Sequence, residues 1–205
     1  MKNRGIFITF EGTEGSGKST NIRFVASYFR RKGKSVLLVR EPGSTKVGEG
    51  IRTVLLDPRN KGMAKETELL LYLAARAELV RERITPALKS GKVVISDRFE
   101  DSTVAYQGFG EGISLNVIER LSQFVRGNLK PNLTFVLDID PRKGLKRGGR
   151  YDRVEKKSDS FHLRVRKGFL VLARKEKKRV VIISAQQPLQ QVQSQIFKKL
   201  KSIYG

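Results

Sequence analysis

The sequence predicts an α/β protein in which one doubly wound, five-stranded parallel sheet lies between two layers of helices. Apolar, strand-like runs alternate along the chain with amphipathic, helix-like runs, which is the pattern of such sheets. Most strand-like runs are rich in Val, Ile and Leu and show no polar alternation, as expected for parallel strands buried on both faces. A chain of 205 residues also suits one α/β domain with a sizeable core.

Taken in order, the first strand is the apolar run that precedes a glycine-rich loop, and the first helix follows that loop directly. Strands are expected at 5–10, 35–40, 93–96, 133–138 and 180–184. Helices are expected at 18–31, 46–56, 65–89, 115–126, 142–147, 160–177 and 189–202. We see no internal repeat, linker or domain boundary, so residues 1–205 are expected to form a single domain. Ligands should bind beyond the carboxyl ends of the strands.

Residues 12–19 read Gly-Thr-Glu-Gly-Ser-Gly-Lys-Ser, a complete P-loop between a predicted strand and a predicted helix. The glycines allow successive N–H groups to point at phosphate oxygens, and the following helix adds its positive N-terminal end. Lys18 should reach the β- and γ-phosphates, and the Ser19 hydroxyl should bind Mg²⁺. One substrate is therefore expected to be a nucleoside triphosphate. The residues expected around it are Gly12, Thr13, Glu14, Gly15, Ser16, Gly17, Lys18, Ser19 and Thr20.

Charged residues follow the second and third strands, where a ligand is expected. Arg40 and Glu41 precede the turn at Pro42-Gly43, although an ordinary turn would also explain this segment. Asp97 is placed to bind Mg²⁺, and Arg98 could bind a phosphate with its planar fork. The alternative for this pair is a structural ion pair.

Two i, i+4 pairs could recognise a nucleotide base. Tyr72 and Arg76 would share one helix face, where a ring could stack on a base and a guanidinium could bond to it. Thr103 and Gln107 can both donate and accept, as the edge of a pyrimidine requires. Taken alone, each pair is as well explained by ordinary core and surface positions.

A basic, glycine-punctuated segment follows the fourth strand and suggests a mobile lid at about 148–158, with arginines for a transferring phosphoryl group. A basic loop without function is the alternative. His162 is interpreted as an ordinary helix residue rather than a catalyst.

The formal net charge of +22 would suit either nucleic acid or a phosphate enzyme with a lysine-rich surface. We favour the second, because no nucleic-acid-binding module is recognisable. The chain has no cysteine, which excludes disulfides and cysteine metal sites. No signal peptide or membrane-length apolar run is visible, so no membrane association and a cytoplasmic location are expected.

Taken together and in order, these segments resemble thymidylate kinases, a family of P-loop nucleoside monophosphate kinases. The resemblance covers nearly the whole chain. It is carried by the segments at 10–12, 40–43, 74–76, 97–99, 105–108, 144–147, 152–155 and 185–188. It implies the P-loop nucleoside monophosphate kinase fold, ATP and dTMP as substrates, Mg²⁺ as cofactor and a homodimer.

The resemblance also implies roles. Glu14 would hold the 3′-hydroxyl of the acceptor sugar, and Tyr106 would crowd the 2′ position. Tyr72, where the family usually has Phe, would stack on thymine. Arg40, Arg98 and Arg52 would bind the acceptor phosphate, with Glu41 beside them; Arg76, Thr103 and Gln107 would read the base edge; Arg147 would pack on the donor adenine.

The P-loop carries Glu14-Gly15-Ser16 where some members of the family have an arginine. The chain therefore resembles bacterial-type members, in which lid arginines act on the transferring phosphate, here Arg150 or Arg153. Arg153 matches the family's lid pattern better. With Lys18, Glu14 and Arg98 these form the expected catalytic set. A related kinase for dUMP or a deoxynucleoside, and a P-loop protein that binds nucleic acid, are the alternatives.

Overall fold

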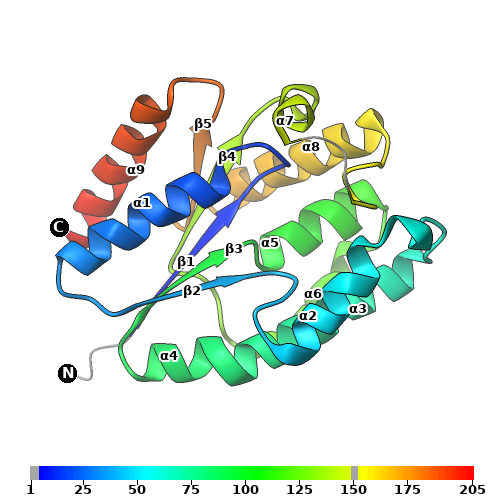
Figure 1. Cartoon of the computed structure of the whole chain (residues 1–205), viewed down its shortest axis with the longest axis horizontal. Coiled ribbons are helices and arrows are strands. Elements are labelled where there is room, and N and C mark those ends of the chain that lie inside the picture. Colours follow the sequence, from blue (N-terminus) through cyan, green and yellow to red (C-terminus); the bar gives the residue numbers. More distant parts are fainter. Residues whose placement is uncertain (1–4, 149–151) are drawn as a thin grey trace.

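A computed structural model describes residues 5–148 and 152–205. Within them, five parallel strands form one sheet in the order β2-β3-β1-β4-β5 (Figure 1). The strands are β1 (Ile6–Glu11), β2 (Val36–Arg40), β3 (Val93–Asp97), β4 (Leu133–Asp138) and β5 (Val180–Ser184). β1 lies at the centre, β2 and β3 lie on one side of it, and β4 and β5 lie on the other, so the sheet is doubly wound and the predicted fold class is confirmed.

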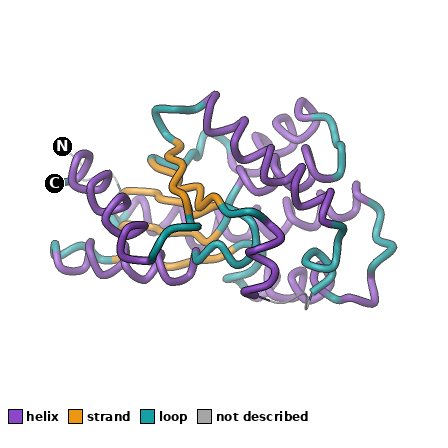
Figure 2. Tube along the Cα trace, turned by 90° about the horizontal axis from the view of Figure 1, so that it is seen from above, coloured by secondary structure: helices purple, strands orange, loops and turns teal. Residues whose placement is uncertain are grey.

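Helices flank the sheet on both faces, as Figure 2 shows in a second view. The longer helices are α1 (Lys18–Arg31), α2 (Lys46–Leu56), α3 (Lys65–Leu79), α6 (Leu115–Arg126), α8 (Asp159–Lys175) and α9 (Leu189–Tyr204). The shorter ones are η1 (Pro58–Asn60), η2 (Val80–Ile84), α4 (Thr85–Lys89), α5 (Glu100–Thr103), η3 (Val104–Gly110) and α7 (Pro141–Gly148). None of the described helices is long and apolar enough to cross a membrane.

The two faces of the sheet belong to different hydrophobic clusters because neighbouring strand residues point in opposite directions. Ile8 and Ile95 pack with residues of α1 and α9. Phe7 and Val94 pack on the other face, with residues of η2 and α4. The strands are therefore buried on both faces, which explains their apolar sequences.

The helix predicted at 65–89 is continuous but changes geometry at η2, which is a π-helical turn between α3 and α4. Pro86 gives the reason: it has no N–H, and its ring would crowd the carbonyl group four residues earlier in a regular α-helix.

The helical segment from Glu100 to Gly110 lies outside the helices that the sequence predicts. Its second half, η3, is also π-helical and packs against α8 at close range. The close approach needs Gly168, where a Cβ would lie 2.9 Å from the Phe109 ring. Tertiary packing therefore supports a segment whose glycines argue against a helix.

Candidate active site

The P-loop connects β1 to α1 and has a conformation that only glycine adopts easily. The backbone φ is 65° at Gly15 and 86° at Gly17. A Cβ on Gly15 would lie 2.0 Å from the carbonyl oxygen of Gly144 in α7. Gly17 is the N-cap of α1 and gives the helix no side-chain hydrogen bond. The first N–H groups of α1 therefore remain available for a phosphate.

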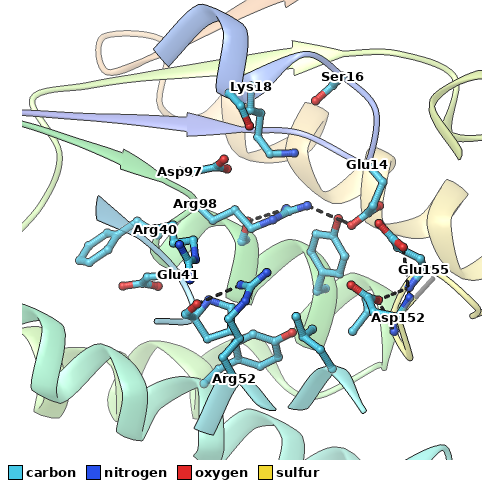
Figure 3. A pocket seen from close by; sticks show the side chains of 18 of the residues that line it. Glu14, Ser16, Lys18, Arg40, Glu41, Arg52, Asp97, Arg98, Asp152 and Glu155 are labelled. Carbon is cyan, nitrogen blue, oxygen red and sulfur yellow. Dashed lines mark hydrogen bonds and ion pairs between the residues drawn. The ribbon is translucent and has the colours of Figure 1, made fainter. Parts of the chain in front are cut away.

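Lys18 points from the start of α1 toward Asp97 and Arg98 (Figure 3). Its ammonium group donates to the carbonyl oxygens of Gly12, at 3.2 Å, and Thr13, at 3.1 Å. Burial, followed by the positive charge of Arg98, lowers the pKa of Lys18 to about 8. The cation is therefore poorly solvated, and an anionic phosphate would stabilise its charged form.

A cavity of about 510 Å³ extends from the P-loop across the carboxyl ends of β2 and β3 to α3 and η3. This volume suits a small-molecule ligand. Predicted site residues that line it are Glu14, Gly15, Ser16, Gly17, Lys18, Ser19, Thr20, Arg40, Glu41, Arg52, Tyr72, Arg76, Asp97, Arg98, Thr103, Tyr106, Gln107 and Arg147. The fold thus joins segments that are more than 100 residues apart in the sequence.

Arg98 connects the P-loop to the other side of the cavity. Its guanidinium donates to Glu14 Oε1 at 3.0 Å, to the carbonyl oxygen of Gly12 at 3.1 Å and to the Ser102 hydroxyl at 3.1 Å (Figure 3). The Tyr106 hydroxyl donates to the same Glu14 oxygen at 2.6 Å. Burial raises the pKa of Glu14, but the charges of Arg98 and Lys18 and the Tyr106 bond outweigh it, and the pKa is lowered. Glu14 is therefore an ionised carboxylate on the cavity wall.

A second buried cation, Arg76, belongs to α3 itself. Arg76 is 1% exposed, forms a bidentate ion pair with Glu41 and donates to the Thr103 hydroxyl at 2.9 Å. Its Nη1 atom is buried and has no hydrogen-bond partner in the described part of the chain. An unsatisfied buried donor is costly, so a ligand acceptor at Nη1 would stabilise this arrangement. The bidentate ion pair with Glu41 fixes the guanidinium so that Nη1 is available to such a ligand.

Two further arginines lie at the rim of the cavity. Arg40 forms an ion pair with Glu49 in α2 at 2.8 Å, and its side chain is half exposed. Arg52 donates from α2 to the carbonyl oxygen of Pro42 at 3.0 Å. Both line the cavity, so α2 and the turn after β2 supply cations to the same region.

The donor atoms expected for Mg²⁺ are the Asp97 carboxylate and the Ser19 hydroxyl, and both residues line the cavity. These are hard oxygen ligands, which suit Mg²⁺. Among the described residues there is no group of three or more His, Cys, Asp or Glu that could hold a metal ion. A metal ion held here would therefore share its coordination with phosphate oxygens and water.

Comparisons with known proteins identify the family of this chain. The family model described as thymidylate kinase matches residues 10–196. The chain belongs to the thymidylate kinase family. A thymidylate kinase of Halothermothrix orenii is 45% identical over 204 residues, which cover 97% of both proteins. One of Pseudomonas fluorescens is 49% identical over 195 residues, 94% of this chain and 93% of that protein. The crystal structure of thymidylate kinase from Ehrlichia chaffeensis gives a TM-score of 0.79 at 35% identity, over 96% of this chain and 99% of the other.

Membership of the thymidylate kinase family confirms that the chain is a phosphotransferase, and it favours this interpretation over the alternatives left open by the sequence. The individual residue roles implied by the resemblance stay predictions. For Arg147, on α7, the structure gives a place on the cavity wall and a bond to the carbonyl oxygen of Ala185 at 3.4 Å.

Arg153, which the resemblance assigns to the transferring phosphoryl group, is paired with other protein groups in this structure. It is 5% exposed, is absent from the described cavity wall, donates to the carbonyl oxygen of Leu55 at 2.7 Å and is 2.6 Å from Glu68. Its burial and ion pair make it an anchor of the lid in this structure. Arg150 and the predicted hinge residue Gly149 lie outside the described residues. Of the predicted P-loop residues, Gly12 and Thr13 are not among those that line the cavity.

Sequence reasoning misses several residues of this thymidylate kinase site. Ser102, Asp152 and Glu155 line the cavity, and Ser102 holds Arg98. His162 Nδ1 lies 3.6 Å from Glu14 Oε2, although the sequence suggests only an ordinary helix residue. The sequence does contain a clue to Ser102, because it adjoins the predicted site residue Thr103. It contains no clue to His162, because only the packing of α8 brings that residue to the P-loop.

Proposed function

We propose that this chain transfers the γ-phosphate of ATP to dTMP and releases dTDP and ADP, a step in dTTP synthesis. The observation that carries the proposal is the cavity in which the P-loop faces the residues expected to bind a nucleotide base and its phosphate. A protein that used the P-loop only as a switch would not need Tyr72, Arg76 and Gln107 on the opposite wall.

In the proposed complex, dTMP lies between α3 and η3. Tyr72 stacks on the base, and burial raises the pKa of Tyr72, so its hydroxyl stays neutral. Arg76 and Gln107 bond to the base edge, with Thr103 in support, and Tyr106 occupies the space beside the 2′ carbon. The ion pair with Glu49 supports Arg40 as a ligand of the acceptor phosphate, together with Arg98 and Arg52.

The reaction needs alignment and charge neutralisation rather than a general base. An oxygen of the dTMP phosphate is already anionic near neutral pH and attacks the γ-phosphorus of ATP in line as the bond to ADP breaks. Lys18 leaves the carbonyl oxygens of Gly12 and Thr13 when the nucleotide binds. Its ammonium group then stabilises the negative charge that shifts among the phosphates during the transfer. Asp97 and Ser19 would hold Mg²⁺, which neutralises charge on the β- and γ-phosphates. Arg147 packs on the donor adenine.

Homodimer formation is part of the proposal. It is supported by exposed apolar side chains on three neighbouring helices, α2, α3 and α6. Of these, α3 packs against both α2 and α6. These side chains are Val47, Val54, Leu70, Leu115, Val117 and Phe124, and Phe124 is 89% exposed. A helix surface of this kind is typical of a protein interface.

The test is coupled ADP release with ATP, Mg²⁺ and a panel of nucleoside monophosphates. We expect dTMP to be the best acceptor. We expect dUMP to have a kcat/KM about 10–200-fold lower, because one missing methyl group in a pocket is worth roughly 1–3 kcal/mol. A Lys18→Ala control should remove turnover without unfolding the protein. If dTMP released no ADP above the ATP-only blank while another monophosphate did, the substrate assignment would be wrong.

A further inference from the structure

Glu68 is a buried carboxylate in the first turn of α3 that lies behind the described cavity wall. Three side chains from distant segments bond to it. The amide nitrogen of Gln107, in η3, donates to Oε1 at 2.8 Å. Lys157 Nζ lies 2.9 Å from Oε2, and Arg153 Nη2 lies 2.6 Å from the same oxygen. Lys157 also contacts Glu111. Glu68 therefore joins η3 to the part of the predicted lid that contains Arg153 and Lys157.

The two cations keep this carboxylate ionised. Burial raises the pKa of Glu68, but the charge and hydrogen bond of Lys157, the Gln107 bond and the charge of Arg153 together outweigh it, so the pKa is lowered. An ionised carboxylate can only accept hydrogen bonds. Gln107 must therefore turn its Nε2 toward Glu68, since the opposite orientation would place oxygen against oxygen. The orientation of this amide follows from the chemistry of its partner.

With Nε2 engaged, Oε1 is the polar atom that Gln107 can offer to the cavity it lines. No described residue donates a hydrogen bond to Oε1, whereas the unpartnered Nη1 of Arg76 offers a donor in the same cavity. A pyrimidine that presents a carbonyl oxygen and a neighbouring N–H satisfies both atoms. Thymine presents O4 and N3–H. Cytosine presents an amino group and an unprotonated N3, which would oppose both protein atoms.

We propose that Glu68 is a positioning residue that selects thymine over cytosine by holding the Gln107 amide with its oxygen toward the base. The inference rests on the proposed function and specifies how its acceptor site excludes a second pyrimidine. Glu68 itself does not contact the base. Its effect should therefore appear in the ratio of two substrates rather than in the rate for one.

The experiment compares kcat/KM for dTMP and dCMP in the full-length wild type and in Glu68→Gln, with thermal melting as a check of folding. A neutral amide at this position can accept as well as donate, which frees Gln107 to rotate. We expect the dTMP to dCMP ratio to fall at least about tenfold, the size expected when an unpaired polar group at a base edge gains a partner. Where dCMP turnover is too slow to follow, its inhibition constant against dTMP replaces it.

Two further variants separate positioning from stability. Glu111→Gln removes another carboxylate that contacts Lys157 but does not touch Gln107, and it should keep the wild-type ratio. The exchange Glu68→Gln/Gln107→Glu returns an acceptor-only group to the base and should restore the preference for dTMP. If Glu68→Gln does not fold, Glu68→Asp keeps the charge for both cations while withdrawing it from Gln107, and should lower the ratio in the same way.

Equal losses for dTMP and dCMP in the folded Glu68 variants would overturn the inference and leave Glu68 a structural residue. The inference would also be overturned if Glu111→Gln lowered the ratio as much as Glu68→Gln. Failure of the proposed function looks different: the wild type would then not prefer dTMP at all, whatever Glu68 does to the ratio.

Discussion

At the scale of single residues, Glu11 shows how a buried acid can organise a site without lining the cavity. It ends β1 and is fully buried. Oε1 accepts from the N–H of Phe99 at 2.8 Å, and Oε2 accepts from the Ser102 hydroxyl at 2.5 Å. These bonds fix the start of α5 relative to the P-loop, and Ser102 in turn holds Arg98. Burial, reinforced by the charge of Asp101, raises the pKa of Glu11 to about 8.

The raised pKa predicts that Glu11 makes the protein less stable as the pH rises. Between its ordinary pKa of 4.5 and about 8, the carboxyl is ionised in the unfolded chain and protonated in the folded one. The folded state then binds more protons, so the free energy of unfolding falls as pH rises through this window. Glu11→Gln can accept from Phe99 and donate to Ser102 without titrating. We expect urea unfolding between about pH 5 and pH 8 to show a smaller loss of stability in this variant than in the wild type.

Glu66→Gln, on the exposed side of α3, is the control for the removal of one carboxylate. Its free energy of unfolding should depend on pH as that of the wild type does. Parallel pH dependences in Glu11→Gln and the wild type would show that Glu11 is already ionised in the folded state.

At the scale of elements, the site depends on backbone contacts that bring α7 against the P-loop. Ideal Cβ atoms placed on Gly15 and Gly144 would lie 2.0 Å and 2.2 Å from the carbonyl oxygens of Gly144 and Glu14. The sequence predicts both elements, but only the packed structure shows that they touch. The same holds for Thr103, at the end of α5, and Gln107, in the π-helical η3, which line one cavity from a helical segment that sequence patterns do not reveal.

Gly144→Ala should therefore disturb ATP binding. The new methyl group must displace the P-loop backbone at Glu14, and overpacking of this kind typically costs about 1–3 kcal/mol. We expect a lower melting temperature and a kcat/KM for ATP at least about tenfold below that of the wild type. Gly50→Ala is the matched control, because that helical glycine has open space around its Cβ position. A normal KM for ATP in Gly144→Ala would show that the P-loop can shift without cost.

Substitution of the two lid arginines, Arg150 and Arg153, should affect different properties of the protein. Arg153 is tied to Leu55 and Glu68, so Arg153→Ala should lower the melting temperature and loosen the lid. Arg150→Ala should lower kcat, by about 10³-fold if Arg150 acts as a finger on the γ-phosphate, with little change in melting temperature or in the KM for dTMP. Steady-state kinetics and thermal melting of both single variants and the double variant measure this. A double variant with near-normal kcat would exclude catalysis by this lid.

At the scale of the whole molecule, charge and exposed apolar surface point to different partners. The net charge of +22 matches a protein that handles polyphosphates, so we do not propose nucleic acid as a partner. The exposed apolar side chains of α2, α3 and α6 instead support the proposed homodimer. Phe124 is the most exposed of them, which makes it the side chain whose burial would contribute most.

Phe124→Glu should therefore shift the protein from dimer to monomer in sedimentation velocity experiments, because a carboxylate in an apolar interface must lose its water. Leu189→Glu, which places the same charge on an exposed position of α9, should leave the dimer intact. A monomeric wild type, or a dimer that is unaffected by Phe124→Glu, would contradict an interface centred on α6.

Local patterns in the sequence were enough to predict the fold class, the P-loop and the succession of strands and helices apart from the helical segment between Glu100 and Gly110, because hydrophobic periodicity and glycine spacing act locally. Motifs at the ends of strands, two i, i+4 pairs and the resemblance to thymidylate kinases together identified most of the cavity-lining residues. Which groups pair became visible only in the folded chain: Glu41 with Arg76, Glu14 with Arg98 and Tyr106, and Glu68 with Gln107. The fold also paired Arg153 of the lid with the buried Glu68. A buried charge pairs with the partner that packing brings within bonding distance, and that distance is not encoded in any local pattern.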